Sequence, residues 1–300
     1  MTENNFKSGF VSIVGSPNVG KSTLMNAFVG QKVAIVSNRP QTTRNRIMGV
    51  VTRPEFQIIF IDTPGIHTPK NRLGQYMVKV AYDALNEVEC ILFMTDATIG
   101  IKERDEGILT QLKKAKSPAI AAVNKIDIAG KDKVKAALER LQAEEWLNAV
   151  IPISAATGEG LTELESKLRS FLVPGPKYFP DDMVTDQPER VLCAEMIREQ
   201  ALLLLKEEVP HGLGVDIDKM EIRENGLTDV WATIYCERDS HKGIIIGKRG
   251  AMLKEIGQRA RGEIEWMLGA RVNLQIWVKV KEDWRNQPST LKMLGYQDEK

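Results

Sequence analysis

The 300-residue sequence predicts an α/β protein, in which a mostly parallel, doubly wound sheet is followed by a smaller α+β domain. Five short apolar runs alternate with helical stretches in the first half of the chain: FVSIVG, IIFID, CILFM, AIAAVN and VIPIS. Strands that are apolar throughout are typical of a parallel sheet covered by helices on both faces. We expect those helices at 21–29, 77–87, 104–115, 132–146 and 162–170.

A proline-rich segment separates the two predicted domains. The stretch VPGPKYFPDDMVTDQP, at 173–188, holds four prolines and cannot continue a helix. We therefore expect a first domain at 1–175, a linker at 176–190 and a second domain at 191–300.

The second domain has a different rhythm. An amphipathic helix is expected over RVLCAEMIREQALLLL, and two segments of period two, GVDIDKMEI and DVWATIYCE, predict paired antiparallel strands. A turn and a further helix follow, whose apolar residues recur at helical spacing: Leu253, Ile256, Ala260 and Ile264. The alternating RVNLQIWVKV predicts a last strand, so the expected order is α, β, β, α, glycine turn, α, β.

Composition excludes several classes of protein. The net charge is +1, so a polyanionic partner must be held by a local basic patch. Three scattered cysteines, Cys90, Cys193 and Cys236, indicate buried thiols in a reducing cytoplasm and no zinc site. The first residues lack an apolar signal-like run, and no run approaches the roughly 18 residues of a membrane span, so we expect neither export nor membrane crossing.

The first glycine-rich loop predicts a nucleotide site. GSPNVGKS, at 15–22, fits GxxxxGK[ST] between a strand and a helix, where backbone amides cradle phosphate oxygens. Lys21 is expected to reach the β and γ phosphates, and the Ser22 hydroxyl to ligate Mg²⁺. The candidate residues of this loop are Gly15, Ser16, Pro17, Asn18, Val19, Gly20, Lys21, Ser22 and Thr23.

A second loop, DTPG, follows the strand IIFI and leaves the sheet at the same edge. An aspartate at a strand end suits an indirect role in holding Mg²⁺, and the Gly65 amide can meet the γ-phosphate. Taken alone, the sequence DTPG fits a simple turn as well as it fits a loop that contacts phosphate. The candidates here are Asp62, Thr63, Pro64, Gly65 and Ile66.

Two further motifs indicate which nucleobase the site binds. NKID, at 124–127, ends the strand AIAAV, and a carboxylate at Asp127 accepts from the two adjacent donors of guanine but repels adenine. SAA, at 154–156, fits a backbone contact to guanine O6. The candidates are Asn124, Lys125, Asp127, Ser154, Ala155 and Ala156.

A polar segment, QKVAIVSNRPQTTRNR, lies between the phosphate loop and the next predicted strand, at 31–46. It is either a passive loop or a segment held by the metal ion and γ-phosphate and released on hydrolysis. Its threonines offer a second hydroxyl for Mg²⁺, and we expect Thr43, with Thr42 as the alternative.

A second glycine turn, Gly247-Lys-Arg-Gly250, has no GK[ST] and joins two predicted helices. Residues 238–261 contain seven Lys or Arg against Asp239 and Glu255, a local charge of +5 that favours a polyanion. The alternative is a solvated helical face between two core stripes.

Together these motifs carry a family resemblance. The order GSPNVGKS, TT, DTPG, NKID, SAA is similar to the translation-factor-related small GTPases, and with IIIGKRG nearly the whole chain resembles the Era family of bacterial GTPases. The resemblance implies Mg²⁺-dependent hydrolysis of GTP to GDP and phosphate. It also implies a C-terminal type II KH domain, whose GxxG loop clamps about four nucleotides of single-stranded RNA. The implied RNA-binding residues are Ile246, Gly247, Lys248, Arg249, Gly250 and Lys254.

Further expectations follow from the resemblance. The implied partners are the 3′ region of 16S rRNA and the 30S subunit in maturation, with weak peripheral association at the inner membrane, no DNA binding and a monomeric state. Asn18 stands where family members help hold K⁺, and Ile66 stands where Ras-like enzymes carry a water-orienting glutamine. The expected catalytic residues are therefore Lys21, Thr43, Asn18 and Gly65.

Other classes remain as alternatives. Tandem GTPases carry two sets of these motifs, and tRNA-modifying GTPases end in a cysteine motif, whereas this chain has one set and the tail MLGYQDEK. A membrane-associated or cell-cycle signalling GTPase whose C-terminal module binds protein or lipid is the main rival hypothesis. A nucleotide-independent RNA chaperone is the third.

Overall fold

The computed structural model describes residues 6–37, 39, 42–85, 88–206 and 209–296. The chain divides into two compact units. The first comprises residues 1–34, 43–68 and 77–186, and the second comprises 35–42, 69–76 and 187–300. Each unit is organised around buried hydrophobic clusters of its own.

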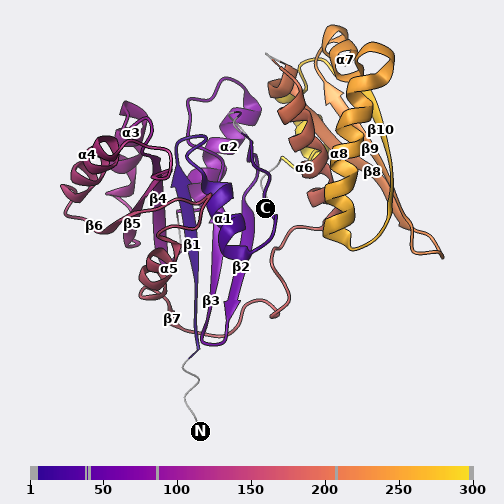
Figure 1. Ribbon diagram of the computed structural model, residues 1–300. Helices are drawn as coiled ribbons and strands as arrows, with labels where there is room; N and C mark the ends of the chain where they lie inside the picture. The colour runs from indigo at the N-terminus through magenta and orange to yellow at the C-terminus, as the bar shows by residue number, and fades with distance from the viewer. Residues whose placement is uncertain (1–5, 38, 40–41, 86–87, 207–208, 297–300) are drawn as a thin grey trace. The chain divides into compact units, whose positions relative to one another are not determined.

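Within the described residues, the first unit is built on a seven-stranded sheet (Figure 1). Six strands lie in the order β2-β3-β1-β4-β5-β6, and β7 pairs with the start of β1. Their bounds are β1 (Lys7–Gly15), β2 (Ile47–Arg53), β3 (Phe56–Asp62), β4 (Cys90–Asp96), β5 (Ala119–Asn124), β6 (Leu147–Pro152) and β7 (Val173–Pro174). Because β2 and β7 alone among these run antiparallel to their neighbours, the predicted, mostly parallel sheet is confirmed.

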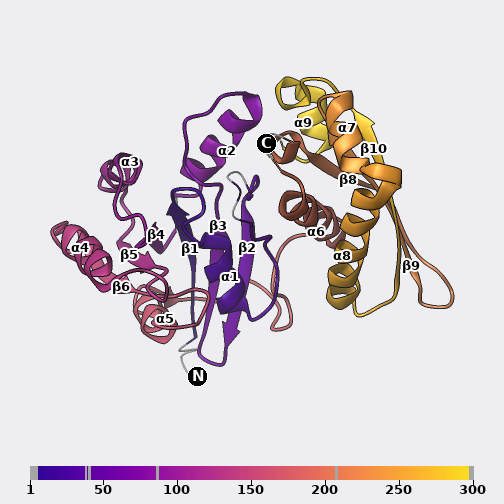
Figure 2. The ribbon, with the colours of Figure 1, turned by 45° about the horizontal axis from the view of Figure 1, so that its top comes forward.

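Helices cover both faces of this sheet (Figures 1 and 2). Phe28 of α1 (Lys21–Val29) and Leu164 of α5 (Leu161–Arg169) pack in the cluster on one face. On the other face lie the part of α2 (Arg72–Asp83) that belongs to the first unit, from Met77 on, together with α3 (Glu103–Leu112) and α4 (Lys131–Gln142). The loops after the parallel strands therefore gather at one edge of the sheet, where open α/β sheets bind ligands.

The sequence analysis did not anticipate β2 or the short β7. Residues Ile47–Arg53 form a hairpin with β3 through a turn at Pro54 and Glu55, so β2 breaks the alternation of strand and helix that guided the prediction. The helix expected at 77–87 is α2, which begins earlier, at Arg72. In the polar segment 31–46, the described residues form neither helix nor strand, as expected.

The second unit contains a three-stranded sheet in the order β10-β9-β8. In it, β8 (Gly214–Ile222) is antiparallel to β9 (Thr228–Cys236), which is parallel to β10 (Val272–Val280). The helical elements are α6 (Glu189–Leu204), η1 (Val209–Gly212), α7 (Asp239–Ile246), η2 (Lys248–Gly250), α8 (Ala251–Leu268), η3 (Trp284–Asn286) and α9 (Pro288–Met293). The predicted order of helices, strands and glycine turn is confirmed as far as β10, whereas η1, η3 and α9 were not predicted.

The core of the second unit lies between its sheet and three helices (Figure 2). Ile197 of α6, Ile245 of α7 and Ile256 of α8 join one buried cluster with alternate residues of β9 and β10. Alternation along a strand places these residues on the same face, so the helices share one side of the sheet. No helix among the described residues has the length and apolar character needed to span a membrane.

Candidate nucleotide site and glycine turn

The predicted phosphate loop connects β1 to α1. Gly15 has a φ of 156° and Gly20 a φ of 102°, values that favour glycine. A Cβ on Gly15 would lie 2.3 Å from the Met94 carbonyl oxygen, and one on Gly20 would lie 2.3 Å from Asn124 Nδ2. Glycine at both positions therefore lets the loop approach β4 and β5. Since α1 begins at Lys21, its first amides have no intrahelical acceptors and are available to an anion.

Lys21 is buried inside the loop that precedes it. Its Nζ donates to the carbonyl oxygens of Gly15, at 3.2 Å, and Ser16, at 3.1 Å. Burial lowers the pKa of Lys21 to about 8, against the opposing attraction of the Asp62 and Asp105 carboxylates. An anionic phosphate would favour the charged ammonium and give it a stronger acceptor than the two carbonyls.

Three oxygen-bearing side chains meet beside Lys21. Ser22 Oγ donates to Asp62 Oδ2 at 2.6 Å and lies 3.0 Å from Thr43 Oγ1, which lies 3.4 Å from the same carboxylate oxygen. Asp62 is fully buried, its Oδ1 has no hydrogen-bond partner among the described residues, and burial raises its pKa. Hydroxyl and carboxylate oxygens are the ligands that Mg²⁺ prefers, so these three residues fit that ion.

The segment that leads to Thr43 is fixed at its start by Asn26 of α1, which the sequence analysis did not single out. Asn26 Oδ1 accepts from the amides of Val33 and Ala34, both at 3.0 Å, and its Nδ2 donates to the Ala34 carbonyl oxygen at 2.7 Å. These hydrogen bonds anchor the start of the polar segment 31–46 to α1, the helix that follows the phosphate loop.

The DTPG loop packs directly on the phosphate loop. A Cβ on Gly65 would lie 2.8 Å from Pro17 Cα and N, and the Ile66 amide donates to the Gly15 carbonyl oxygen at 3.3 Å. Thr63 Oγ1 donates to the Ile13 carbonyl oxygen at 2.8 Å, and Pro64 is buried. Ile66 is buried and its side chain has no polar atom, so it cannot orient a water molecule.

Asn124 joins the phosphate loop to the SAA loop. Its Nδ2 donates to the Val19 carbonyl oxygen at 2.8 Å, and its Oδ1 accepts from the Ala155 amide at 2.9 Å. The buried Asn124 side chain thus connects two loops that are distant in the sequence. Val19 lies 105 positions before Asn124, and Ala155 lies 31 positions after it. The predicted loops of the first unit therefore converge.

The remaining residues of the base motifs line the same edge. Lys125, at a φ of 67°, donates from Nζ to the Asn18 carbonyl oxygen at 2.9 Å and lies 2.6 Å from Asp96 Oδ2. Asp127 is exposed, Ser154 is buried and Ala156 is exposed. The Asp127 carboxylate is therefore accessible to a ligand, and its assignment to the guanine edge stays a prediction.

Two carboxylates outside the predicted motifs also reach the site. Asp96, at the end of β4, holds Lys125, and Asp105, in α3, accepts a hydrogen bond from Ser16 Oγ. The only sequence signal for Asp105 is an acidic residue three positions after Lys102 at a helix start, which indicates a cap and not a loop contact. Thr23 is half-buried in α1.

The second glycine turn lies between α7 and α8 and is largely exposed. Gly247, Arg249 and Gly250 have φ values of 72°, 53° and 79°. A Cβ on Gly247 would lie 2.7 Å from Met252 Cβ, whereas one on Gly250 would meet open space. Because Lys248 and Arg249 are both exposed, the turn presents two cations on a backbone that a ligand can approach closely.

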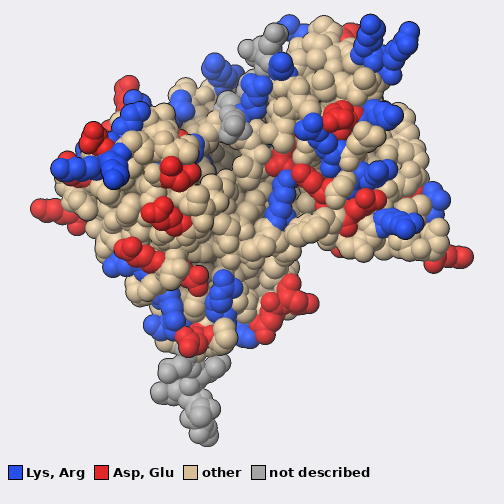
Figure 3. Space-filling view, in the orientation of Figure 1, with Lys and Arg blue, Asp and Glu red and all other residues tan. Residues whose placement is uncertain are grey.

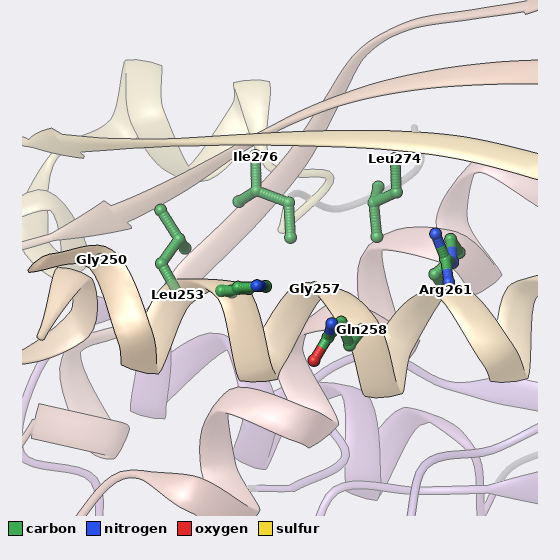
Figure 4. Close-up of a pocket in the computed structure, with 8 residues that line it drawn as sticks. Gly250, Leu253, Gly257, Gln258, Arg261, Leu274 and Ile276 are labelled. Atoms are coloured by element: carbon green, nitrogen blue, oxygen red, sulfur yellow. The ribbon is translucent and has the colours of Figure 1, made fainter.

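A groove of about 460 Å³ runs beside this turn, between α8 and β10 (Figure 4). Leu274 and Ile276 extend from β10 toward the helix, and Leu253 lies near them. The other lining residues are Gly250, Lys254, Gly257, Gln258 and Arg261. The groove therefore combines an apolar strand wall with a polar and cationic helix face.

Positive charge gathers at this end of the second unit. Figure 3 shows Lys and Arg side chains clustered on the part that carries α7. Arg259 Nε donates to Glu255 at 2.7 Å, so the charges of these two residues cancel within the predicted basic patch at 238–261. Lys248, Arg249, Lys254 and Arg261 are exposed.

Two large apolar residues of this region, Ile244 and Trp277, are exposed. Ile245 is fully buried and Ile246 is half-buried, but Ile244 is 49% exposed, because the short helix α7 buries only one side. Trp277 is 45% exposed because it lies on the sheet face opposite the helices.

Family models match both units. A model described as "50S ribosome-binding GTPase" matches residues 10–125, and one described as "KH domain" matches residues 208–285. The predicted fold class, a GTPase domain followed by a KH domain, is confirmed.

Relatives match over the whole chain. The chain is 52% identical over 296 residues to "GTPase Era" of Ruminiclostridium cellulolyticum, covering 99% of each sequence. It is 54% identical over 295 residues to "GTPase Era" of Clostridioides difficile, covering 98% of this chain and 99% of that one.

Solved structures agree with these relatives. An Aquifex aeolicus Era variant bound to GDP and AlF4⁻ is 44% identical, with a TM-score of 0.93 over 97% of this chain and 99% of that one. An Era complex with MgGDPNP and nucleotides 1506–1542 of 16S ribosomal RNA gives the same values. The chain therefore belongs to the Era family of GTPases and is a GTP-hydrolysing enzyme.

Proposed function

We propose that this GTPase binds the 3′ region of 16S ribosomal RNA and acts in maturation of the 30S subunit. The observation that carries the proposal is the exposed turn Gly247–Gly250, with Lys248 and Arg249 beside the groove between α8 and β10. The Era structure that holds nucleotides 1506–1542 of 16S rRNA, 44% identical to this chain, supports the same assignment.

The geometry of the turn suits single-stranded RNA. Open space at Gly250 lets a sugar–phosphate backbone come close, where Lys248 and Arg249 supply positive charge for its phosphates. The apolar wall of Leu253, Leu274 and Ile276 offers a surface for unstacked bases, which a paired helix would not expose. Lys254 lines the groove, and the half-buried Ile246 directly precedes the turn.

In the first unit, the proposal assigns a role to each predicted motif. The backbone N–H groups of the loop from Gly15 to Thr23, which Pro17 lacks, bind the phosphates, and Lys21 neutralises the β and γ oxygens. Ser22, Thr43 and Asp62 would hold Mg²⁺, which supplies further positive charge there. Gly65 contacts the γ-phosphate, Asn124 holds the loops together, and Asp127 with the Ser154–Ala156 backbone selects guanine.

We assign a K⁺ site to Asn18, the exposed residue of the phosphate loop. Because Ile66 has no polar side-chain atom, charge stabilisation in the transition state must come from elsewhere. Hydrolysis measured in KCl and in NaCl tests this assignment. Asn18→Ala should lose any stimulation by K⁺ while keeping its rate in NaCl, and equal rates of the wild-type protein in both salts would contradict it.

A double variant tests RNA binding. Lys248→Ala with Arg249→Ala should weaken binding of an oligonucleotide carrying the 3′-terminal sequence of 16S rRNA by at least about tenfold, while GTP hydrolysis is unchanged. The matched control is Lys113→Ala with Lys114→Ala, which removes the same charge from an exposed position of the first unit. Full RNA binding by the first pair would favour the rival, a C-terminal module for protein or lipid.

A further inference from the structure

Asp105 is a buried carboxylate that none of the nucleotide motifs contains. It is 2% exposed and belongs to the first turn of α3. Its Oδ2 accepts from the Lys102 amide at 3.0 Å, and its Oδ1 accepts from Ser16 Oγ at 2.6 Å. Hydrogen bonds to an ionised acceptor are short and strong, and a buried carboxylate needs them to remain charged. Capping α3 requires only one of the two oxygens, so the bond to Ser16 calls for another explanation.

Ser16 is the residue of the phosphate loop that precedes Pro17. Ser16 is 8% exposed, and its carbonyl oxygen already accepts from Lys21 Nζ. Its side chain therefore leaves the loop on the side of α3, whereas its backbone is held from inside the loop. The hydroxyl bond connects residues 89 positions apart in the sequence.

The neighbouring Pro17 has no amide hydrogen, so it cannot donate to a phosphate and a bound nucleotide cannot fix this turn through it. The protein must hold the turn instead. On its other side Pro17 lies against Gly65, where a Cβ would come within 2.8 Å of the proline Cα and N. A displacement of Ser16 and Pro17 would therefore be transmitted to Gly65, the residue assigned to the γ-phosphate.

We propose that Asp105 is a positioning residue for GTP hydrolysis, acting through Ser16 to keep Pro17 seated against Gly65. The carboxylate touches neither nucleotide nor metal ion. It fixes the first turn of the phosphate loop from α3, and so sets the position from which the Gly65 amide meets the γ-phosphate. Because GDP lacks that phosphate, loss of the contact affects GTP and its hydrolysis more than it affects GDP.

The test is a mutant cycle on the intact protein. Ser16→Ala keeps the Asp105 side chain and its cap of α3, and should lower kcat about tenfold, the equivalent of one hydrogen bond to a charged group. It should weaken binding of a non-hydrolysable GTP analogue while GDP affinity stays within about twofold. Asp105→Ala should lower kcat at least as much, and the double variant should be no slower than Asp105→Ala alone.

Two further variants separate positioning from folding. Asp105→Asn retains an acceptor for the Lys102 amide and an amide group for the Ser16 hydroxyl, so it should recover most of the rate lost in Asp105→Ala. Glu103→Gln removes an exposed carboxylate from the same turn of α3 and should leave kcat unchanged. A wild-type kcat for Ser16→Ala, equal losses of GDP and GTP-analogue affinity, additive effects in the cycle or no recovery in Asp105→Asn would each overturn the proposal.

Discussion

The phosphate loop of the first unit and the glycine turn of the second unit both use glycine and positive φ, but the protein surrounds them differently. At Gly15 and Gly20 a Cβ would strike atoms of β4 and β5 at 2.3 Å, whereas at Gly250 it would meet nothing. Lys21 is buried and bonded to its own loop, while Lys248 and Arg249 are exposed.

This difference follows from the size of the anion that each turn suits. A nucleoside triphosphate can be enclosed, so the first loop is fixed in advance by bonds from Asn124, Lys125 and Asp105. A polynucleotide must enter and leave along a surface, so the second turn offers exposed cations next to a groove. We therefore expect substitutions in the first loop to alter chemistry and stability together, and loss of the exposed Lys248 and Arg249 side chains in the second to alter binding alone.

The largest expected effect is on base specificity. Asp127→Asn should lower the preference for GTP by about 10⁴-fold and favour xanthosine triphosphate, whose carbonyl replaces the guanine amine. Competition binding with GTP, ATP and xanthosine triphosphate measures it. RNA binding in the absence of nucleotide should not change, and a variant that still preferred GTP would show that Asp127 does not read the base.

Next in size is the loss of the buried lysine. Lys21→Ala should slow hydrolysis by about 10²–10³-fold, because it removes a fixed positive charge at the γ-phosphate. Single-turnover hydrolysis measures the rate, and Lys248→Ala serves as the matched loss of one lysine from the other turn. A comparable loss of hydrolysis rate in both variants would contradict the proposal that only the first loop takes part in GTP hydrolysis.

Smaller effects are expected on stability. Gly15→Ala should cost about 3 kcal/mol or more of the free energy of unfolding, since strain at positive φ adds to a clash with the Met94 carbonyl. Gly250→Ala should cost about 1–2 kcal/mol, from its backbone conformation alone. Urea unfolding of both variants measures the difference, and equal costs would contradict the close packing inferred for the first loop.

The smallest expected effect is the alkylation of the cysteines in the native protein. Cys90 is buried in the first unit, and Cys193 and Cys236 are buried in the second. Burial raises the pKa of Cys90 and Cys193 to about 12 and also raises that of Cys236. At pH 8 the thiolate fraction of these cysteines is therefore small, and for Cys90 and Cys193 it grows only as the pH approaches 12. Native protein should resist iodoacetamide at pH 8 and react after unfolding in urea, as mass spectrometry would detect. Rapid labelling of the native chain would show that one of these cores opens readily.

The parts of the fold and site that the sequence predicted are those with local patterns. Apolar runs, helical spacing and short motifs identified most strands, most helices and the loops that converge on Lys21. The strand β2 was missed because the prediction relied on alternating strands and helices, whereas β2 joins β3 directly through a hairpin. Asp105, Asp96 and Asn26 were missed because each is a single polar residue whose role depends on a tertiary contact with a segment that sequence alone does not bring near it.

The exposure of residues around the second glycine turn also could not be predicted from the sequence. Periodicity predicted the helices on either side of it, but not that Ile244 faces solvent or that Trp277 lies on the open sheet face. A short helix such as α7 completes too few turns for its buried side to be read from three successive isoleucines.

The most direct test of two separate anion-binding turns is the salt dependence of RNA affinity. For a single-stranded oligonucleotide with the 3′-terminal sequence of 16S rRNA, the logarithm of affinity should fall with the logarithm of salt concentration by about 0.7 per phosphate contact. Removing Lys248 and Arg249 together should make that slope shallower by about 1.4 and leave the rate of GTP hydrolysis at its wild-type value. An unchanged slope, or a slope that changes only together with the loss of GTP hydrolysis, would contradict the account.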